Sequence, residues 1–156
     1  MHAFLANSGA RIAGRHAKDG VSITAAGSGD ATQVVCDYVD RTGFTSMKVI
    51  ISYTAVLAAT KTLSIASNLA SSLLGGADAG VAFGPALAAT VVATGPGGGG
   101  TVAGVVELDF DLSGADQFVR NLFTPDLSAT ATDTASLSAV YVLSGGISDP
   151  VTGTLV

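Results

Sequence analysis

The fold is decided by residues 105–146, which read VVELDFDLSGADQFVRNLFTPDLSATATDTASLSAVYVLSGG. Apolar and acidic side chains alternate strictly over residues 106–112, a pattern that predicts a strand with one face buried and the other in water. A turn signal at residues 113–116 leads to a second predicted strand, 117–123, which we expect to close against the first as a hairpin. A third strand is predicted at 135–143. These segments indicate an all-β domain.

Upstream, five more strands are predicted, at residues 21–25, 34–39, 47–57, 62–67 and 87–93. The strand at 47–57 has one apolar face, and its second face is half apolar, so we expect it in the middle of a sheet. Segment 60–75 also fits a helix, but its threonines and serines favour a strand to about Ser67 followed by a loop. The glycine run at 95–100 predicts a loop tip.

Seven to nine short strands with regular turn signals predict a jelly roll or another two-sheet antiparallel sandwich, and less often a barrel. A chain of 156 residues is long enough for one domain with its own core. We expect this domain at 19–146, after an extended N-terminal arm at 1–18 and before a C-terminal tail or edge strand at 147–156. The alternative for the arm is a short amphipathic helix that brings Phe4, Leu5 and Ile12 together.

Charge is distributed unevenly between the arm and the body. Residues 1–18 hold three basic residues and no acid, a charge of +3, whereas residues 19–156 hold all twelve acids and four bases, a charge of −8. Such a body is a poor nucleic-acid ligand, because phosphate contacts need clustered lysine and arginine. Residues 79–106 carry no charge, but their prolines and glycines argue against a membrane helix, and the N-terminus lacks the apolar run of a signal peptide.

Three carboxylates, Glu107, Asp109 and Asp111, share one face of the predicted strand at a spacing of about 7 Å. This spacing is too wide for one metal ion without further ligands, so we predict a solvated face. Arg120 lies in the middle of the next predicted strand, and we expect it to pair with one of these acids across the hairpin. A pair between subunits is the alternative for Arg120.

Other candidates for chemistry have simpler interpretations. The glycines at 95–100 lack the Lys-Ser/Thr of a phosphate-binding loop. His2 and His16 lie in the predicted arm, and Cys36, the single cysteine, is expected to be a small core residue and excludes an internal disulfide. We therefore predict no enzyme activity, no metal site and no cofactor.

Three stretches carry a resemblance to a known family: LDFDLSGADQFVR at 108–120, FTPDLSAT at 123–130 and SAVYVLSGG at 138–146. In the order of the predicted strands and in local sequence, these stretches resemble the C-terminal half of small capsid cement, or head decoration, proteins of tailed bacteriophages. The resemblance extends more faintly to 47–53 and 62–67 and does not cover 1–18.

The resemblance implies a jelly roll made in the cytoplasm of the bacterial host and bound to the outer surface of the phage head. There it would sit at symmetric positions between subunits of the major capsid protein, as a dimer or trimer. The residues we expect to contact these partners are Phe4, Leu5, Arg11, Ile12, Arg15, Lys18 and Arg120.

The alternatives to this function are two other roles in a phage particle. A carbohydrate-binding jelly roll of a phage tail or fibre normally exposes aromatic side chains, whereas this chain has no Trp and only three Tyr. A tail-tube or other virion assembly protein would share the composition but polymerise by itself.

Overall fold

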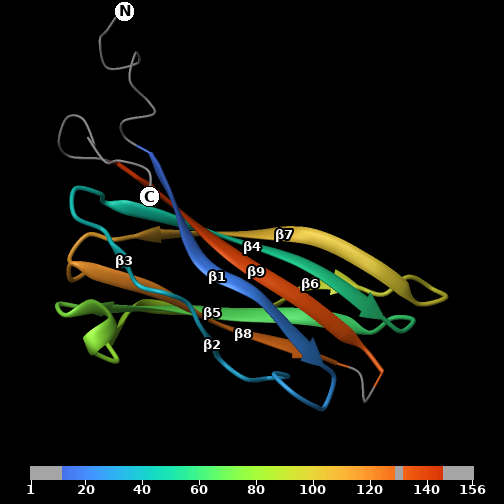
Figure 1. Ribbon diagram of the computed structural model, residues 1–156. Helices are drawn as coiled ribbons and strands as arrows, with labels where there is room; N and C mark the ends of the chain where they lie inside the picture. Colours follow the sequence, from blue (N-terminus) through green and yellow to red (C-terminus); the bar gives the residue numbers. More distant parts are fainter. Residues whose placement is uncertain (1–11, 129–131, 146–156) are drawn as a thin grey trace, which may run out of the picture.

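Two antiparallel β-sheets packed face to face form the protein, in a computed structural model that describes residues 12–128 and 132–145 (Figure 1). Sheet A contains, in spatial order, β1 (Ala13–Thr24), β9 (Thr134–Ser144), β4 (Ser46–Leu57) and β7 (Gly100–Asp111). Sheet B contains β2 (Val34–Val35), β8 (Phe118–Leu127), β5 (Thr62–Ser72) and β6 (Val81–Thr94), and β3 (Val39–Asp40) also pairs with β8. The all-β prediction is confirmed.

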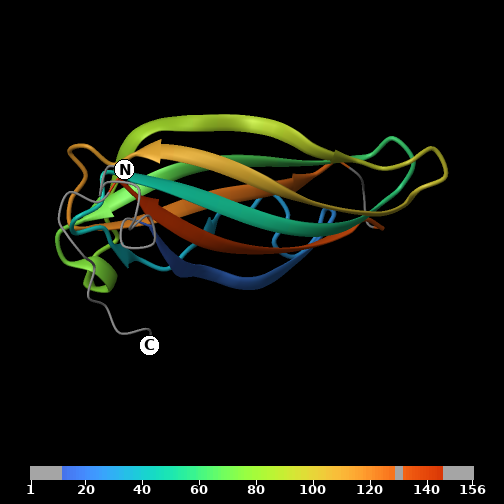
Figure 2. The same cartoon turned by 90° about the horizontal axis from the view of Figure 1, so that it is seen from above.

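The strand order is that of a jelly roll. Most successive strands pass from one sheet to the other, the exceptions being β2 to β3 and β5 to β6, and the order β1-β9-β4-β7 faces the order β2-β8-β5-β6. Figure 2 looks onto sheet A and shows β6, in yellow-green, running along the edge of the molecule beyond β7. The predicted jelly-roll sandwich is confirmed, and the open edges of both sheets exclude the barrel.

Strand β4 lies in the middle of sheet A, as predicted from its apolar first face and half-apolar second face. It pairs with β9 on one side and with β7 on the other over almost its full length. Its inward residues are fully or almost fully buried, and they are Met47, Val49, Ile51, Tyr53, Ala55 and Leu57. This row belongs to one core cluster with the buried residues of β5, β8 and β9.

The hairpin predicted between residues 106–112 and 117–123 is wrong. Strand β7 lies at the edge of sheet A, whereas β8 lies inside sheet B, so the connection crosses the sandwich. Leu112 is fully buried at this crossing, its N–H donates to Thr45 O at 2.8 Å, and Gly114 turns the chain with φ +84°. A turn signal is the same whether the next strand returns to the same sheet or enters the other one, and only packing decides.

The predicted boundary between arm and domain also needs correction, because β1 starts at Ala13 and already includes the end of the expected arm. Ala13 and Ala17 are buried, and the register of β1 against β9 shifts twice between His16 and Val21. These irregularities break the period of two, and alanine gives a weak hydrophobic signal, so the pattern hid the strand. Residues 1–11 and 146–156, and with them most of the predicted arm and the whole tail, lie outside the described residues.

Segment 60–75 forms the predicted strand and not a helix. Strand β5 continues to Ser72, five residues further than predicted, and a 3₁₀ helix (Gly75–Ala77) follows it. Strand β6 begins at Val81, six residues before the predicted start, and the predicted glycine loop joins it to β7. Within the described parts of the chain, no helix has the length and apolar character needed to cross a membrane.

Tyr141 ties the two sheets together at the centre of the core. Its side chain is fully buried on β9, and its hydroxyl accepts a hydrogen bond from Asn121 N (2.9 Å) and donates one to Asp37 O (3.1 Å). Asn121 belongs to β8, and Asp37 lies in the gap between β2 and β3, where backbone groups of β8 have no neighbouring strand. The phenol oxygen of Tyr141 therefore makes the hydrogen bonds that a neighbouring strand would otherwise make to these backbone groups.

Candidate interaction surfaces

The residues predicted to contact partners are only partly described by the structure. Phe4, Leu5 and Arg11 lie outside the described residues. Ile12 is 51% exposed immediately before β1. Arg15 is exposed on β1, with Nη1 donating to Gly14 O at 2.9 Å, and Lys18 is half-buried further along the same strand.

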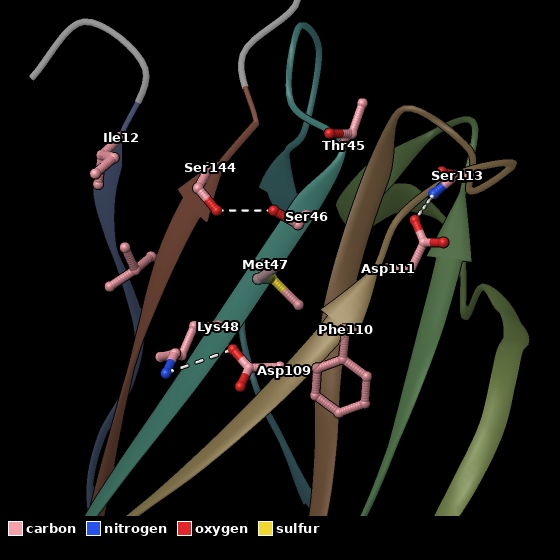
Figure 3. Close-up of a pocket in the computed structure, with 11 residues that line it drawn as sticks. Ile12, Thr45, Ser46, Met47, Lys48, Asp109, Phe110, Asp111, Ser113 and Ser144 are labelled. Atoms are coloured by element: carbon pink, nitrogen blue, oxygen red, sulfur yellow. Dashed lines mark hydrogen bonds and ion pairs between the residues drawn. The ribbon is translucent and has the colours of Figure 1, made fainter. Parts of the chain in front are cut away.

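Ile12 lines a hollow of about 510 Å³ on the outer face of sheet A (Figure 3). On its floor, the hydroxyls of Ser46 and Ser144 share a hydrogen bond of 2.7 Å between β4 and β9. Lys48 and Asp109 form one wall, and their side chains approach within 3.5 Å. The hollow therefore lies where residue 12 leaves sheet A, with an ion pair at its side.

The three carboxylates of β7 lie exposed on the outer face of sheet A, as predicted for a solvated face. Their cation is Lys48 and not Arg120: Lys48 Nζ lies 2.6 Å from Glu107 Oε2 on the paired strand. This hydrogen bond raises the pKa of Lys48. Asp111 instead accepts from Ser113 N at 2.8 Å, and hydrogen bonds from Ser113 lower the pKa of Asp111.

Arg120 cannot reach these acids within the chain, because β8 belongs to sheet B and its side chain lies on the opposite outer face. Its guanidinium stacks over the ring of Tyr38, 4.4 Å from the centroid, and donates to Ala79 O. The predicted ion pair between Arg120 and an acid of β7 is therefore wrong, because β7 and β8 do not form a hairpin. The pair between subunits stays a prediction.

Cys36 is a core residue, as predicted, with 2% of its surface exposed. Burial raises the pKa of its thiol to about 11, so the thiol is protonated at neutral pH. His16 is exposed and lies 3.1 Å from Asp19 and 3.4 Å from Asp37. Among the residues that the structure describes, no three His, Cys, Asp or Glu side chains converge as metal ligands would.

One surface was missed by the sequence reasoning, and it is the side of the sandwich where β6 and β7 end their sheets. Inward side chains of both strands are only partly buried there, and they include Phe83, Val92, Val106, Leu108 and Phe110. Two hollows of about 400 and 210 Å³ open between the strands, and Leu87 lines both. The signal in the sequence was the absence of charge over residues 79–106.

Comparisons with known proteins reveal similarity in fold only. No protein-family model matches the sequence, and no curated protein matches it either. Among solved structures, a chain of the infectious bursal disease virus particle matches 90% of this chain with a TM-score of 0.50 and 13% identity. This chain spans about a third of the length of the virus chain, 32% in that structure.

Two shorter proteins also match with lower scores. The Eiger TNF of S. frugiperda covers 93% of this chain and 99% of its own, at 11% identity and a TM-score of 0.43. YomS, a protein derived from the SPBc2 prophage, covers 80% of this chain and 93% of its own, at 15% identity and a TM-score of 0.34. The matched feature is the jelly-roll sandwich.

Proposed function

We propose that this protein is a structural virion protein, a cement protein that binds the outer surface of a phage head between major capsid subunits and stabilises it. The observation that carries the proposal is the jelly roll itself, which matches a chain of a virus particle over 90% of its length. The resemblance of residues 108–146 to phage head decoration proteins supports the same role. A structural role needs a rigid scaffold, and two tightly packed sheets provide one.

We propose a structural role rather than a catalytic one. The strongest nucleophile of the chain, Cys36, is buried, and burial raises its pKa to about 11. A thiol in this state is a poor nucleophile at neutral pH, because the thiolate is the reactive form.

The contact with the capsid is assigned to residues 1–11 together with the exposed start of β1. Ile12 and Arg15 are exposed beside the point where residues 1–11 join the sheet. Ordering a segment on a partner costs about 1–2 kcal/mol per residue in backbone entropy, so Phe4 and Leu5 have to bury apolar surface there as well. Arg11, Arg15 and Lys18 add charge contacts, which by themselves are weak in water.

Co-sedimentation with purified heads of the phage that encodes the protein tests this function. We expect the full chain to pellet with intact heads at a fixed ratio to the major capsid protein, and to lie on their outer surface by electron microscopy. Removal of residues 1–11 should lower the occupancy without unfolding the domain. Removal of 1–18 is unsuitable, because it also deletes half of β1.

Two outcomes would contradict the proposal. Full chain that stays in the supernatant of intact heads would remove the cement role. Rings or tubes formed by the purified protein alone would favour the tail-tube alternative. If the variant without residues 1–11 binds as well as the full chain, the contact surface lies elsewhere on the domain.

A further inference from the structure

Strand β7 has one edge that no neighbouring strand covers. In the part of the chain that the structure describes, β7 pairs only with β4 and β6 pairs only with β5, so each ends its own sheet. Figure 2 shows both strands along the same side of the sandwich. The backbone N–H and C=O groups on the open side of an edge strand are free to pair with an added strand. Strand β7 offers such an edge over 12 residues.

The inward side chains of β7 leave the core incompletely covered at this edge. Exposed and half-buried residues alternate along the whole of β7, and none of its residues is fully buried. The inward row of β9, by contrast, is buried at every position. The half-buried row of β7 includes Val106, Leu108 and Phe110, which pack against the core. Apolar side chains of an added strand would complete the burial of this row, which is favourable.

Two hollows lie along this row, between β6 and β7. The first, of about 400 Å³, is lined by Val106 and Leu108, and the second, of about 210 Å³, is lined by Phe110. Leu87 lines both, so the hollows follow one another along β7. Residues 106–111 span about 20 Å at about 3.3 Å each. The hollows therefore suit a short segment of extended chain.

The outer face of the same stretch of β7 is acidic. Glu107, Asp109 and Asp111 alternate with the half-buried row, and they also line the two hollows. Lys48 on β4 lies 2.6 Å from Glu107 and 3.5 Å from Asp109 (Figure 3). Three carboxylates and one lysine leave a net charge of −2 beside the open edge. This charge repels an acidic strand, a second β7 included, and attracts a basic one, because opposite charges on paired strands stabilise and like charges destabilise.

We propose that the open edge of β7 binds an extended basic segment of another protein, which adds to sheet A as a further strand. The segment alternates apolar side chains, which fill the two hollows, with lysine or arginine opposite Glu107, Asp109 and Asp111. Side chains directly opposite on paired antiparallel strands lie about 4.5–5.5 Å apart, so each cation reaches a carboxylate. Main-chain hydrogen bonds supply the affinity, and the alternation supplies the specificity. This site is separate from the contact assigned to residues 1–11.

A fluorescent peptide of about seven residues, in which lysine alternates with valine and leucine, tests this site with the full chain. We expect saturable binding by fluorescence anisotropy. A peptide of the same composition with its lysines grouped at one end, and one with glutamate in place of lysine, should each bind about tenfold more weakly. The bound peptide should slow amide hydrogen exchange in β7 and leave exchange in β1, the other edge strand of sheet A, unchanged.

Two variants locate the site. Asp109→Lys reverses a charge on a side chain that is 76% exposed, and Leu87→Lys places a cation between the two hollows. Each should weaken binding about tenfold. The matched control is Asp126→Lys, which makes the same reversal at an exposed position of β8 in the other sheet and should bind as the wild type does. Circular dichroism checks that every variant is folded.

Three results would overturn the proposal. They are no saturable binding of the alternating peptide, equal binding of the peptide with grouped lysines, and wild-type affinity in the folded variants with lysine at positions 87 and 109. The experiment needs no phage heads, so its failure is distinguishable from a failure of the cement role.

Discussion

The three tyrosines of this chain provide an internal test of how the core is held together, because their hydroxyls have three different environments. The hydroxyl of Tyr141 is fully buried and has two backbone partners, Asn121 N at 2.9 Å and Asp37 O at 3.1 Å. The hydroxyl of Tyr53 donates to Val92 O at 2.6 Å. The hydroxyl of Tyr38 is buried without a partner among the described residues.

Replacing each tyrosine by phenylalanine removes one oxygen and leaves the ring in place. Tyr141→Phe leaves a buried N–H without an acceptor, and such a group costs about 1–3 kcal/mol. We therefore expect the free energy of unfolding to fall by about 2 kcal/mol. Tyr53→Phe leaves only a carbonyl on the exposed strand β6, so its cost should be about 1 kcal/mol. Tyr38→Phe removes an unpaired buried hydroxyl and should be neutral or slightly stabilising.

Urea denaturation followed by far-ultraviolet circular dichroism, at one protein concentration for all variants, measures these differences. A loss of about 2 kcal/mol corresponds to a fall in Tm of roughly 4–8 °C for a domain of this size. The order of cost should be Tyr141, then Tyr53, then Tyr38. The reasoning is refuted if Tyr38→Phe costs as much as Tyr141→Phe, or if Tyr141→Phe lies within about 0.5 kcal/mol of the wild type.

Three further predictions concern the loop, the thiol and the surface. Gly95→Ala should destabilise the domain by about 1–3 kcal/mol, because its Cβ would collide with the backbone oxygen of Ala58. Gly97→Ala has open space around its Cβ and should be neutral in the same denaturation assay. The raised pKa of Cys36 makes the folded state bind its proton more tightly than the unfolded state, so stability should fall as the pH rises from about 9 to about 11, and less steeply in Cys36→Ala. A thiol reagent should modify Cys36 only after denaturant is added, and rapid labelling of the folded chain would contradict its burial. Lys48→Met removes an exposed ion pair and should change the free energy of unfolding by less than about 1 kcal/mol; a larger loss would show that Lys48 and Glu107 are coupled more strongly than a surface pair.

The fold class could be predicted because a strand leaves a period of two in the sequence wherever one face is buried. Strands β4, β7 and β9 each alternate without interruption, and β4 and β9 were predicted to within one residue at both ends. Strand β7 begins at Gly100, six residues before the predicted start. Strand β1 was missed at its start because two shifts in register break its period and alanines supply its buried face. Strand β6 was predicted too short because both of its faces are exposed and its pattern is weak.

The candidate surfaces depended more on tertiary structure. The sequence by itself determined that Glu107 and Asp109 face water and that Cys36 is buried, because side-chain polarity and strand period decide which face a residue occupies. The sequence alone does not show whether Lys48 or Arg120 pairs with Glu107. Lys48 is the partner because β4 pairs with β7, and this pairing is a tertiary contact.

The sequence also shows that segment 79–106 has no charged residue, but it does not show where this segment lies on the molecule. Only the jelly-roll topology places β6 and β7 at the ends of their sheets on one side of the sandwich, where the segment becomes an exposed apolar edge. Local pattern thus determined the strands and their faces, because these depend on neighbours along the chain. Tertiary structure decided the sheet order, the partner of each charge and the free edge, because these depend on contacts between residues far apart in sequence.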